Sequence, residues 1–470
     1  MEFHVSLVGR TDLTGQIYRQ VAAAVLDGRL RPGQALPPSR ELAARLEVSR
    51  NTVSAAYDRL TAEGFVSART GSGTYVREGG FERPPEPAAG AELRPRAIWS
   101  RIKVPPTDVS EPRFDFRAGI PDVRMFPYAS WRRLMSRRLR ASAIGPPSYG
   151  DPAGHAGLRA ALARHVGVSR AVRATADDVL ITNGAQHAVD LIGRVLVEPG
   201  MCVAVEDPGY PPQRQLLRSL GARVAGVPVD SEGLVVDRIP REAKLVCVTP
   251  SHQFPLGVPM SLPRRTALLE WAERTGGVIV EDDYDSEFRF SGRPIEPVQN
   301  LDRTGRVIYV GSMSKVLLPT LRIGFLIAPR SLRPALRAAR HVTDAHTSLP
   351  VQAALAEFVE EGLLARHIRR CRAAYADRYR RISAGLRRDF GGLLDVLPAE
   401  AGLHLCARLP EGTDDRAASE RAAAGGVGIM PLSPFGRAGA TPPGLVFGYG
   451  GIDASDVDEG LARLRECLGG

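Results

Sequence analysis

The chain has 470 residues, of which 44% are hydrophobic and 24% charged, and it carries a formal net charge of +10. These proportions are ordinary for a soluble globular protein of two or three domains. No apolar run reaches the roughly 20 residues of a membrane helix, and residues 1–10 lack the layout of a signal peptide. We therefore expect a cytoplasmic protein without a membrane partner. Scattered cysteines without ligand spacing argue against a disulfide framework and a metal site.

The N-terminal part of the chain shows the pattern of a small helical domain that ends in a hairpin. Apolar residues recur at helical spacing over residues 13–25. We expect a second helix capped by Ser39 and, after a short interval, a third helix opened by Ser49. Residues 65–69 and 74–76 are typical of two strands around a Gly-rich turn. Three helices followed by such a hairpin predict a winged helix-turn-helix.

Residues 79–112 are rich in Pro, Ala and Glu and show no sustained apolar period. We interpret this stretch as a linker, stiffened by its prolines, between a winged helix-turn-helix domain at 1–78 and a larger body at 113–470. The body alternates helical stretches with short apolar strands, at 179–182, 202–205, 245–248, 278–280, 307–310 and 325–327. This alternation favours a mainly parallel sheet, whose sites lie at the carboxyl ends of its strands.

One lysine of the body stands out against an arginine-rich background. The chain holds 62 Lys plus Arg, yet only Lys103, Lys244 and Lys315 are lysines. Lys315 follows the strand-like run 307–310 and precedes Arg322, whereas the other two lack such a context. Because arginine cannot form a Schiff base, this context predicts a lysine that holds pyridoxal 5'-phosphate.

A pyridoxal phosphate site also needs an acid for the pyridine nitrogen, phosphate ligands and a flat surface against the ring. Asp282, at a strand end, is the candidate acid, and Tyr284 could hydrogen-bond the ring phenolate. Tyr210 is the candidate to lie over the ring, although core packing is the default for such a tyrosine. The phosphate candidates are a helix start and donors around Lys315, namely Gly184, Ala185, Gln186, Ser312, Ser314 and Arg322.

From residue 113 onward the sequence resembles the fold-type I aminotransferases. The resemblance implies an α/β body with a smaller C-terminal α+β lobe. The run 312–315 with Arg322 is similar to the family's lysine signature, which implies that Lys315 is the internal-aldimine lysine and Arg322 a phosphate ligand. The segment that begins at Tyr149 resembles the part by which one subunit reaches the cofactor phosphate of its partner. A homodimer is thereby implied.

Two departures from the aminotransferase pattern put ordinary transamination in doubt. Phe254 stands where those enzymes have an asparagine for the phenolic oxygen of the cofactor. The residues left for that contact are His252, Gln253 and Tyr284. Residues 444–449 hold no arginine, whereas the enzymes place one there for the substrate carboxylate. The candidate replacements are Arg214 and Arg437.

The predicted winged domain has polar residues where helix-turn-helix proteins contact DNA. Arg50 can bind guanine bidentately, and Asn51 can read adenine or fix a phosphate. Arg40 is placed to meet the phosphodiester, and Arg69 of the Gly-rich wing to reach a minor groove. Taken singly, each has a plain alternative as part of a solvated helix start or turn. The predicted DNA-binding set is Ser39, Arg40, Ser49, Arg50, Asn51, Thr52, Arg69 and Gly73.

The string from Gly28 to Val76 resembles the GntR family of winged-helix DNA-binding domains nearly throughout. Joined to an aminotransferase-like body, it is similar to the MocR subfamily of transcriptional regulators, which the run 249–255 around Phe254 also resembles. The resemblance implies a pyridoxal phosphate-dependent regulator that binds a double-stranded DNA operator. It also implies that the body senses the cofactor or an amino compound, in control of vitamin B6 or of amine and amino-acid metabolism. The rival hypotheses are a working aminotransferase with an accessory head and a head that binds proteins.

Overall fold

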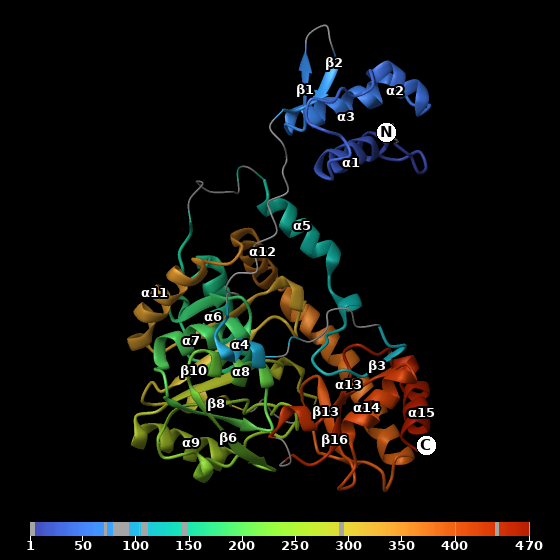
Figure 1. The fold of residues 1–470 in the computed structure, drawn as a ribbon. Coiled ribbons are helices and arrows are strands. Elements are labelled where there is room, and N and C mark those ends of the chain that lie inside the picture. The colour runs from blue at the N-terminus through green and yellow to red at the C-terminus, as the bar shows by residue number, and fades with distance from the viewer. Residues whose placement is uncertain are drawn as a thin grey trace. The chain divides into compact units, whose positions relative to one another are not determined.

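The computed structural model describes residues 5–69, 73–78, 94–102, 104, 111–140, 142, 149–290, 296–399, 401–437 and 441–469. The chain divides into two compact units, Met1–Pro95 and Arg96–Gly470 (Figure 1). Most of the stretch expected as a linker, 79–112, and the wing-tip residues 70–72 lie outside the described residues, so the predicted domain boundaries stay predictions. Among the described helices, none combines the length and apolarity that crossing a bilayer requires.

The first unit contains three helices and a hairpin. The elements are α1 (Leu13–Leu26), α2 (Ser39–Arg45), α3 (Arg50–Ala62), β1 (Val66–Arg69) and β2 (Gly73–Val76). β1 and β2 pair antiparallel, and Ile17, Val21, Val53 and Leu60 are fully buried in one core. This order confirms the predicted winged helix-turn-helix.

The two predicted helix caps turn out differently. Ser49 caps α3, because its hydroxyl accepts the backbone N–H of Thr52 at 3.1 Å. Ser39 does not cap α2; it is the first helical residue, and Pro38 precedes it without a side-chain hydrogen bond. Pro38, with φ −52° and ψ 139°, occupies the N-cap position itself, and its side chain has no atom that could accept a backbone N–H.

The body is built on a mixed, mostly parallel eight-stranded sheet with the order β4-β11-β10-β9-β8-β5-β6-β7. β11 is antiparallel to both of its neighbours, β10 and β4, so β4 runs in the same direction as β10. The start of β11 therefore lies at the edge where the parallel strands end. The strands are β4 (Val179–Thr182), β5 (Cys202–Asp207), β6 (Arg223–Asp230), β7 (Gly233–Leu234), β8 (Ala243–Val248), β9 (Val278–Asp283), β10 (Val307–Ser312) and β11 (Gly324–Ile327).

Helices cover both faces of this sheet. Successive residues of a strand point to opposite faces, so each strand packs against helices on both sides. Ile308 and Val310 of β10 pack with Leu191 of α7 and Leu336 of α11, whereas Tyr309 packs with α6 and α13 on the other face. The helices of the body are α4 (Ala97–Arg101), α5 (Tyr128–Arg138), α6 (Ala156–Arg170), α7 (Ala185–Leu196), α8 (Pro211–Ser219), α9 (Leu262–Thr275), α10 (Val298–Leu301), α11 (Arg333–Asp344), α12 (Leu349–Glu360), α13 (Leu363–Asp389), α14 (Asp415–Ala424) and α15 (Val457–Leu468).

A smaller C-terminal lobe combines an antiparallel sheet of order β12-β13-β16-β15 with α13, α14 and α15. Its strands are β12 (Asp395–Val396), β13 (His404–Arg408), β15 (Met430–Pro431) and β16 (Gly444–Gly448). At the start of the body, β3 (Phe114–Asp115) pairs with β14 (Val427–Gly428) of this lobe. The large sheet and the α+β lobe confirm the predicted fold class.

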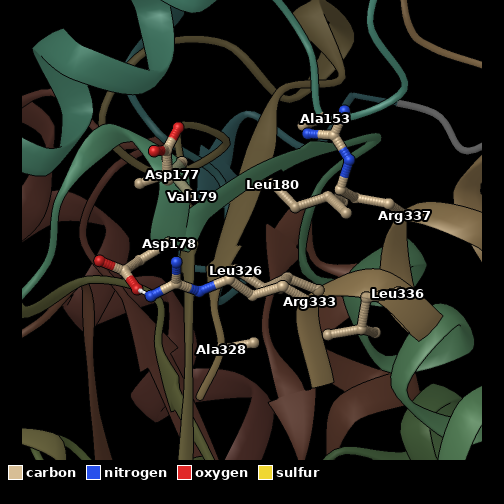
Figure 2. Close-up of a pocket in the computed structure, with 10 residues that line it drawn as sticks. All are labelled: Ala153, Asp177, Asp178, Val179, Leu180, Leu326, Ala328, Arg333, Leu336 and Arg337. Carbon is tan, nitrogen blue, oxygen red and sulfur yellow. Dashed lines mark ion pairs between the residues drawn. The ribbon is translucent and has the colours of Figure 1, made fainter. Parts of the chain in front are cut away.

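α11 packs against the end of the sheet formed by β4 and β11. Arg333 of α11 forms an ion pair with Asp178, and Arg337 pairs with Asp151 at 2.7 Å. Figure 2 shows the small pocket at this junction, lined by both arginines and by Leu180 and Leu326 of the two strands. None of the predicted cofactor-binding residues lines it, so the pocket belongs to the contact between helix and sheet.

Candidate functional site

The edge at which the parallel strands end gathers the predicted cofactor residues. Asp282 lies near the end of β9, Ser312 ends β10, and Lys315 follows soon after. Gly184 follows β4 and Arg322 precedes β11, and the strand directions bring both to the same edge. Long-range sheet pairing therefore assembles residues that are far apart in the sequence.

The side chain of Lys315 is partly buried and points to the start of the body. Its Nζ donates a hydrogen bond to the carbonyl oxygen of Gly119 at 2.6 Å. Burial lowers the pKa of the Lys315 amine, while the carboxylates of Asp285 and Asp282 act in the opposite direction. A lowered pKa favours the unprotonated amine, which is the form that attacks a carbonyl carbon.

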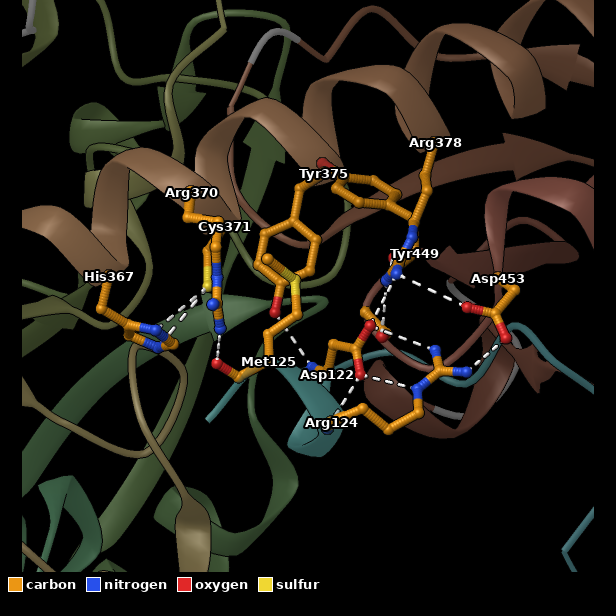
Figure 3. Close-up of polar contacts among 11 residues, drawn as sticks. Asp122, Arg124, Met125, His367, Arg370, Cys371, Tyr375, Arg378, Tyr449 and Asp453 are labelled. Carbon is orange, nitrogen blue, oxygen red and sulfur yellow. Dashed lines mark hydrogen bonds and ion pairs between the residues drawn. The ribbon is translucent and has the colours of Figure 1, made fainter. Parts of the chain in front are cut away.

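Buried charges fix the segment that carries Gly119. Figure 3 shows Arg378 of α13 paired with Asp122 at 2.6 Å, and the same guanidinium donates to the carbonyl of Tyr449 at 3.2 Å. Arg378 and Asp122 are both buried. This network ties the segment after β3 to the C-terminal lobe, and so fixes the carbonyl that contacts Lys315.

Asp282 faces the opposite side of β9 from Asp283, because side chains alternate along a strand. Oδ2 of Asp283 is paired with Arg170 at 2.9 Å and accepts the hydroxyl of Tyr309 at 2.6 Å. Oδ1 of Asp282 is buried and has no hydrogen-bond partner within the described residues, and the same holds for Oδ1 of Asp283. Burial, together with nearby carboxylates, raises the pKa of Asp282 to about 7. A protonated pyridine nitrogen would satisfy such a carboxylate.

A cup suited to an anion forms where β4 leads into α7. Gly184 has a φ of 81°, and α7 starts at Ala185, so the N–H groups of its first turn lack helical acceptors. Arg322, with a φ of 51°, donates to the carbonyl of Asn183 at 2.6 Å. A Cβ at Gly184 would lie 3.5 Å from the guanidinium, and one at Gly324 would lie 2.7 Å from Gly184 Cα. Gly324 thus allows the close approach to Gly184, whereas glycine at 184 is favoured by its positive φ.

Other predicted phosphate donors are partly engaged within the chain. The hydroxyl of Ser312 accepts the backbone N–H of Ser314 at 3.1 Å, and its own proton can still be donated. The side chain of Gln186 donates to the carbonyl of Pro212 at 3.0 Å. The contribution of Gln186 to the cup is therefore its backbone N–H in the first turn of α7.

Aromatic side chains form a wall beside these residues, with Phe254 at its centre. The ring centroid of Phe254 lies 6.0 Å from that of Tyr210 and 6.3 Å from that of Tyr284, edge-on in both cases. Burial raises the pKa of Tyr210, Asp282 raises it further and Arg322 lowers it. Tyr210 is therefore within electrostatic range of the groups predicted for the ring nitrogen and for the phosphate.

Of the three residues proposed to contact the phenolic oxygen of the cofactor, Gln253 is already hydrogen-bonded within the chain. Its amide nitrogen donates to the carbonyls of Pro208 at 2.9 Å and Phe254 at 2.7 Å. Tyr284 donates to the backbone carbonyl of His252 at 2.9 Å, and its oxygen can still accept. His252 and Tyr284 therefore stay as the candidates.

The candidate replacements for the carboxylate arginine join loops of the body. Arg214 pairs with Asp207 at 3.4 Å and donates to the carbonyl of Gly209 at 3.1 Å. The backbone N–H of Arg437 donates to the same Asp207 at 2.9 Å. The guanidinium of Arg214 is thus engaged in holding the end of β5 in place.

Tyr149 lies outside the cluster around Lys315. Its side chain is 87% exposed, and its ring centroid lies 6.1 Å from that of His346. A residue that completes the site of a partner subunit is exposed in a single chain, so the role of Tyr149 stays a prediction.

The structure adds residues that the sequence did not single out. His404 of β13 lies against His252, with ring centroids 4.4 Å apart, and Nδ1 of His252 lies 3.0 Å from Asp285. Gly402 makes room for them, because a Cβ there would lie 2.0 Å from Nδ1 of His252. The acidic run 281–285 was a signal for Asp285. No local pattern identifies His404, which comes from the C-terminal lobe.

In the first unit, the start of α3 presents the predicted base-reading residues. Arg50 and Asn51 are exposed there, and Arg40 is exposed in the first turn of α2. The hydroxyls of Ser49 and Thr52 lie 2.8 Å apart, so they stabilise the helix start as well as facing solvent. These positions agree with a recognition helix that enters a groove with its amino end.

The predicted wing residues are more constrained. Arg69 pairs with Glu78 at 2.9 Å, and its guanidinium lies over Tyr75, 4.8 Å from the ring centroid. Gly73 has a φ of 113°, which favours glycine. Arg69 must therefore leave an ion pair before it can contact a phosphate or a base.

Comparison with known proteins agrees with this two-part architecture. The chain matches the bacterial regulatory proteins of the gntR family over residues 13–76 and aminotransferase class I and II over residues 127–464. It is 39% identical over 464 residues to the probable rhizopine catabolism regulatory protein MocR of Rhizobium meliloti, covering 96% of this chain and 93% of the relative. It is 32% identical over 464 residues to the HTH-type pyridoxine biosynthesis transcriptional regulator PdxR of Corynebacterium glutamicum, covering 97% and 96%.

The body is also similar to a solved enzyme structure, the kynurenine aminotransferase of Pyrococcus horikoshii. The TM-score is 0.71 at 29% identity, covering 80% of this chain and 95% of the enzyme. The full-length matches, by contrast, are to regulators that join both parts. The chain therefore belongs to the MocR subfamily of GntR-type transcriptional regulators.

Proposed function

We propose that this regulator carries pyridoxal 5'-phosphate on Lys315 and senses the cofactor or an amino compound through its body. The observation that carries the proposal is the meeting of two groups at one sheet edge. These are the Lys315 amine, whose pKa is lowered by burial, and the buried, unpartnered Oδ1 of Asp282. The first suits reversible bonding to an aldehyde, and the second suits a cationic ring nitrogen.

The remaining residues suit the other parts of the cofactor. Arg322 and the N–H groups after Gly184 would hold the phosphate, Tyr210 would lie against the ring, and His252 or Tyr284 would contact the phenolic oxygen. When bound, the cofactor supplies an aldehyde carbon to which amines attach reversibly. The chain's own residues orient that group and exclude water from it.

The head would bind an operator as half of a homodimer. Two heads read two half-sites about 34 Å apart or a multiple of that distance, and the amino end of α3 enters the major groove. Exposed Arg50 and Asn51 support this role, and exposed Tyr149 supports a dimer in which each body completes the cofactor site of the other. Such a regulator would act in the cytoplasm, where the operator is.

Two relatives support two classes of controlled pathway. One is named for rhizopine catabolism and the other for pyridoxine biosynthesis. Control of amine catabolism and control of vitamin B6 supply are therefore both proposed. In either case, ligand binding changes DNA binding only if the ligand has different affinities for two conformations of the dimer.

Operator binding measured with and without pyridoxal phosphate tests the proposal. The chain's own upstream DNA serves as the operator, and wild type is compared with Lys315→Ala and with Lys244→Ala, an exposed lysine as control. We expect the cofactor to change the affinity or footprint of wild type and Lys244→Ala but not of Lys315→Ala. Identical affinity and footprint in all cases would contradict the coupling. A chain that shows no visible absorption band with excess cofactor would contradict cofactor binding itself.

A further inference from the structure

A buried histidine, aspartate and histidine lie together beside Lys315. His252, Asp285 and His404 each have about 1% of their surface exposed. A ring nitrogen of each histidine and a carboxylate oxygen of Asp285 all lie within 4.8 Å of one another. His404 pairs with Gly448 across β13 and β16, and a Cβ at Gly448 would lie 2.8 Å from Cα of Ala118, the residue before Gly119. Since the carbonyl of Gly119 accepts from Lys315, the cluster lies near the amine proposed to hold the cofactor.

Both imidazoles use Nδ1 as a hydrogen-bond donor. Nδ1 of His252 lies 3.0 Å from the carboxylate of Asp285, and an ionised carboxylate only accepts. His404 hydrogen-bonds the backbone of Pro255, which offers only a carbonyl oxygen. Since Nε2 of His404 has no hydrogen-bond partner, the donor to Pro255 is its Nδ1.

When the ring is neutral, the opposite nitrogen is an acceptor without a partner. Nε2 of His252 and Nε2 of His404 are both buried, and neither has a hydrogen-bond partner among the described residues. Burial is the largest effect on the pKa of His404 and, with His252 and Lys315, lowers it well below the usual value, so this ring is neutral. Two buried lone pairs are satisfied by a group that brings N–H or O–H donors.

Among the described residues, β16 offers no cation for a carboxylate, and Arg378 and Arg214 are engaged elsewhere. β16, at 444–448, carries no polar side chain, and on the paired strand His404 stands opposite Gly448. Arg378 is engaged by Asp122 and by backbone carbonyls. Arg214 is engaged by Asp207 and the carbonyl of Gly209. A ligand carboxylate at the two histidines would meet lone pairs of like polarity, because exposed Arg437 follows β15 and does not belong to β16.

We infer that the effector site takes an amine whose second polar group is a hydrogen-bond donor, such as a hydroxyl, and discriminates against amines that carry a carboxylate. His252 and His404 are the residues that bind this group, and Asp285 positions His252. The inference rests on the proposed function, because the amine of the effector is taken to react at the cofactor held by Lys315. It adds the chemical class of the effector and the residues that select it.

The exchange at the cofactor balances without a further reactant. The effector nitrogen forms a bond to the cofactor carbon that held Lys315, and the bond from that carbon to Nζ breaks. Lys315 leaves as a free amine, and the two protons lost by the incoming nitrogen pass to it. No oxidant or reductant is consumed, so selectivity depends only on contacts to the rest of the effector.

A matched set of small amines tests the inference on the full, cofactor-loaded chain. Propylamine and 2-aminoethanol differ by a methyl group against a hydroxyl, and β-alanine adds a carboxylate. Titrations that follow the visible absorption of the bound cofactor give half-saturation values, expressed as unprotonated amine. We expect 2-aminoethanol to saturate at about tenfold lower concentration than propylamine, as one or two added hydrogen bonds imply, and β-alanine to be the weakest. Equal values for the first two, or tighter binding of β-alanine, would overturn the inference.

Variants assign the preference to the histidine. His404→Leu should remove the advantage of 2-aminoethanol over propylamine, whereas His404→Gln, which keeps an acceptor oxygen, should retain part of it. His341→Leu, at an exposed position of α11, is the control and should leave it unchanged. If His404→Leu fails to hold the cofactor, His404→Gln and the wild-type series decide. An unchanged preference in both His404 variants would contradict the assignment.

Two other results would also be decisive. A metal ion bound at one per chain, and lost in His404→Leu, would overturn the inference by giving the lone pairs a different partner. A chain that never develops the visible band with excess pyridoxal phosphate would overturn the proposed function and this inference with it. A chain that develops the band and prefers β-alanine would overturn only the inference.

Discussion

The head and the body place their functional side chains in opposite environments. In the head, Arg50 and Asn51 are exposed at the start of α3, so they add little to the cost of folding. In the body, Oδ1 of Asp282 and Nε2 of His404 are buried without partners, and such groups destabilise a fold until a ligand satisfies them. We therefore expect mutations at the head interface to alter DNA affinity alone, and mutations at the body site to alter stability and ligand binding together.

The largest expected effect concerns the buried pair of Arg170 and Asp283, whose side chains are 5% and 1% exposed. Arg170→Met leaves the carboxylate of Asp283 buried without its cation, which should cost about 3–5 kcal/mol of the free energy of unfolding. All the tryptophans, Trp99, Trp131 and Trp271, belong to the body, so urea unfolding followed by tryptophan fluorescence reports on this unit.

The control for that measurement is Arg164→Met on the same helix. Arg164 and its partner Glu360 are largely exposed, and exposed pairs contribute about 0–1 kcal/mol. Amide hydrogen exchange in the head should be unchanged in both variants. Equal urea midpoints for Arg170→Met and Arg164→Met would break the comparison, because the buried pair would then matter no more than a surface pair.

A pH dependence at Asp282 sharpens the same comparison. Burial raises the pKa of this carboxyl to about 7 from a usual value of 3.8, so its protonated form is favoured by folding. The resulting stabilisation is complete below the unfolded pKa and is lost as the pH rises through about 7. In the cofactor-free chain, the free energy of unfolding of Asp282→Asn relative to that of wild type should therefore rise by on the order of 2 kcal/mol between about pH 5 and pH 8.

Urea midpoints of the two proteins across this range provide the test, with the exposed Asp177→Asn as control. The cofactor should reduce the difference, because a cationic ring nitrogen stabilises the ionised carboxylate of wild type. Parallel curves for Asp282→Asn and wild type would show that Asp282 does not titrate in this range.

At the head interface the expected effect is on affinity. Arg50→Ala should weaken binding to the chain's upstream DNA by about tenfold, as the loss of one bidentate base contact implies. Arg19→Ala on α1, where Arg19 is 59% exposed and pairs with Asp12, is the control of equal charge. The visible absorption of the cofactor should be the same in both. If wild type shows no binding to lose, the rival view of the head as a protein-interaction module gains support.

The sequence predicted the parts of the molecule that depend on local order. The helix start at Ser49, the two-stranded hairpin and a mainly parallel sheet were predicted from spacing, caps and apolar runs. Lys315 and Asp282 were proposed as site residues because each follows or ends an apolar strand, and strands of a parallel sheet end at one edge. The sequence pattern around each residue was enough there, because the sheet brings the ends of its parallel strands to one edge.

Residues brought in from elsewhere could not be predicted in this way. His404 approaches His252 only because the C-terminal lobe packs on the large sheet, and Gly119 reaches Lys315 through a segment held by Arg378 and Asp122. Ser39 had the right residue type for a cap, yet Pro38 occupies the cap position and Ser39 is the first helical residue. In each case packing or a neighbouring backbone restraint determined the outcome.

The smallest expected effect tests that last point within the head. Ser49→Ala removes the hydroxyl that accepts the N–H of Thr52, and should cost about 1 kcal/mol of the stability of the head. Ser39→Ala is the matched control: Ser39 makes no capping hydrogen bond, and alanine is the better helix former, so its effect should be near zero or slightly stabilising. Hydrogen exchange of the α2 and α3 amides measures both, while tryptophan fluorescence should show the body unchanged. Equal losses in the two variants would mean that both serines cap, and that the start of α2 is set by the hydroxyl of Ser39 after all.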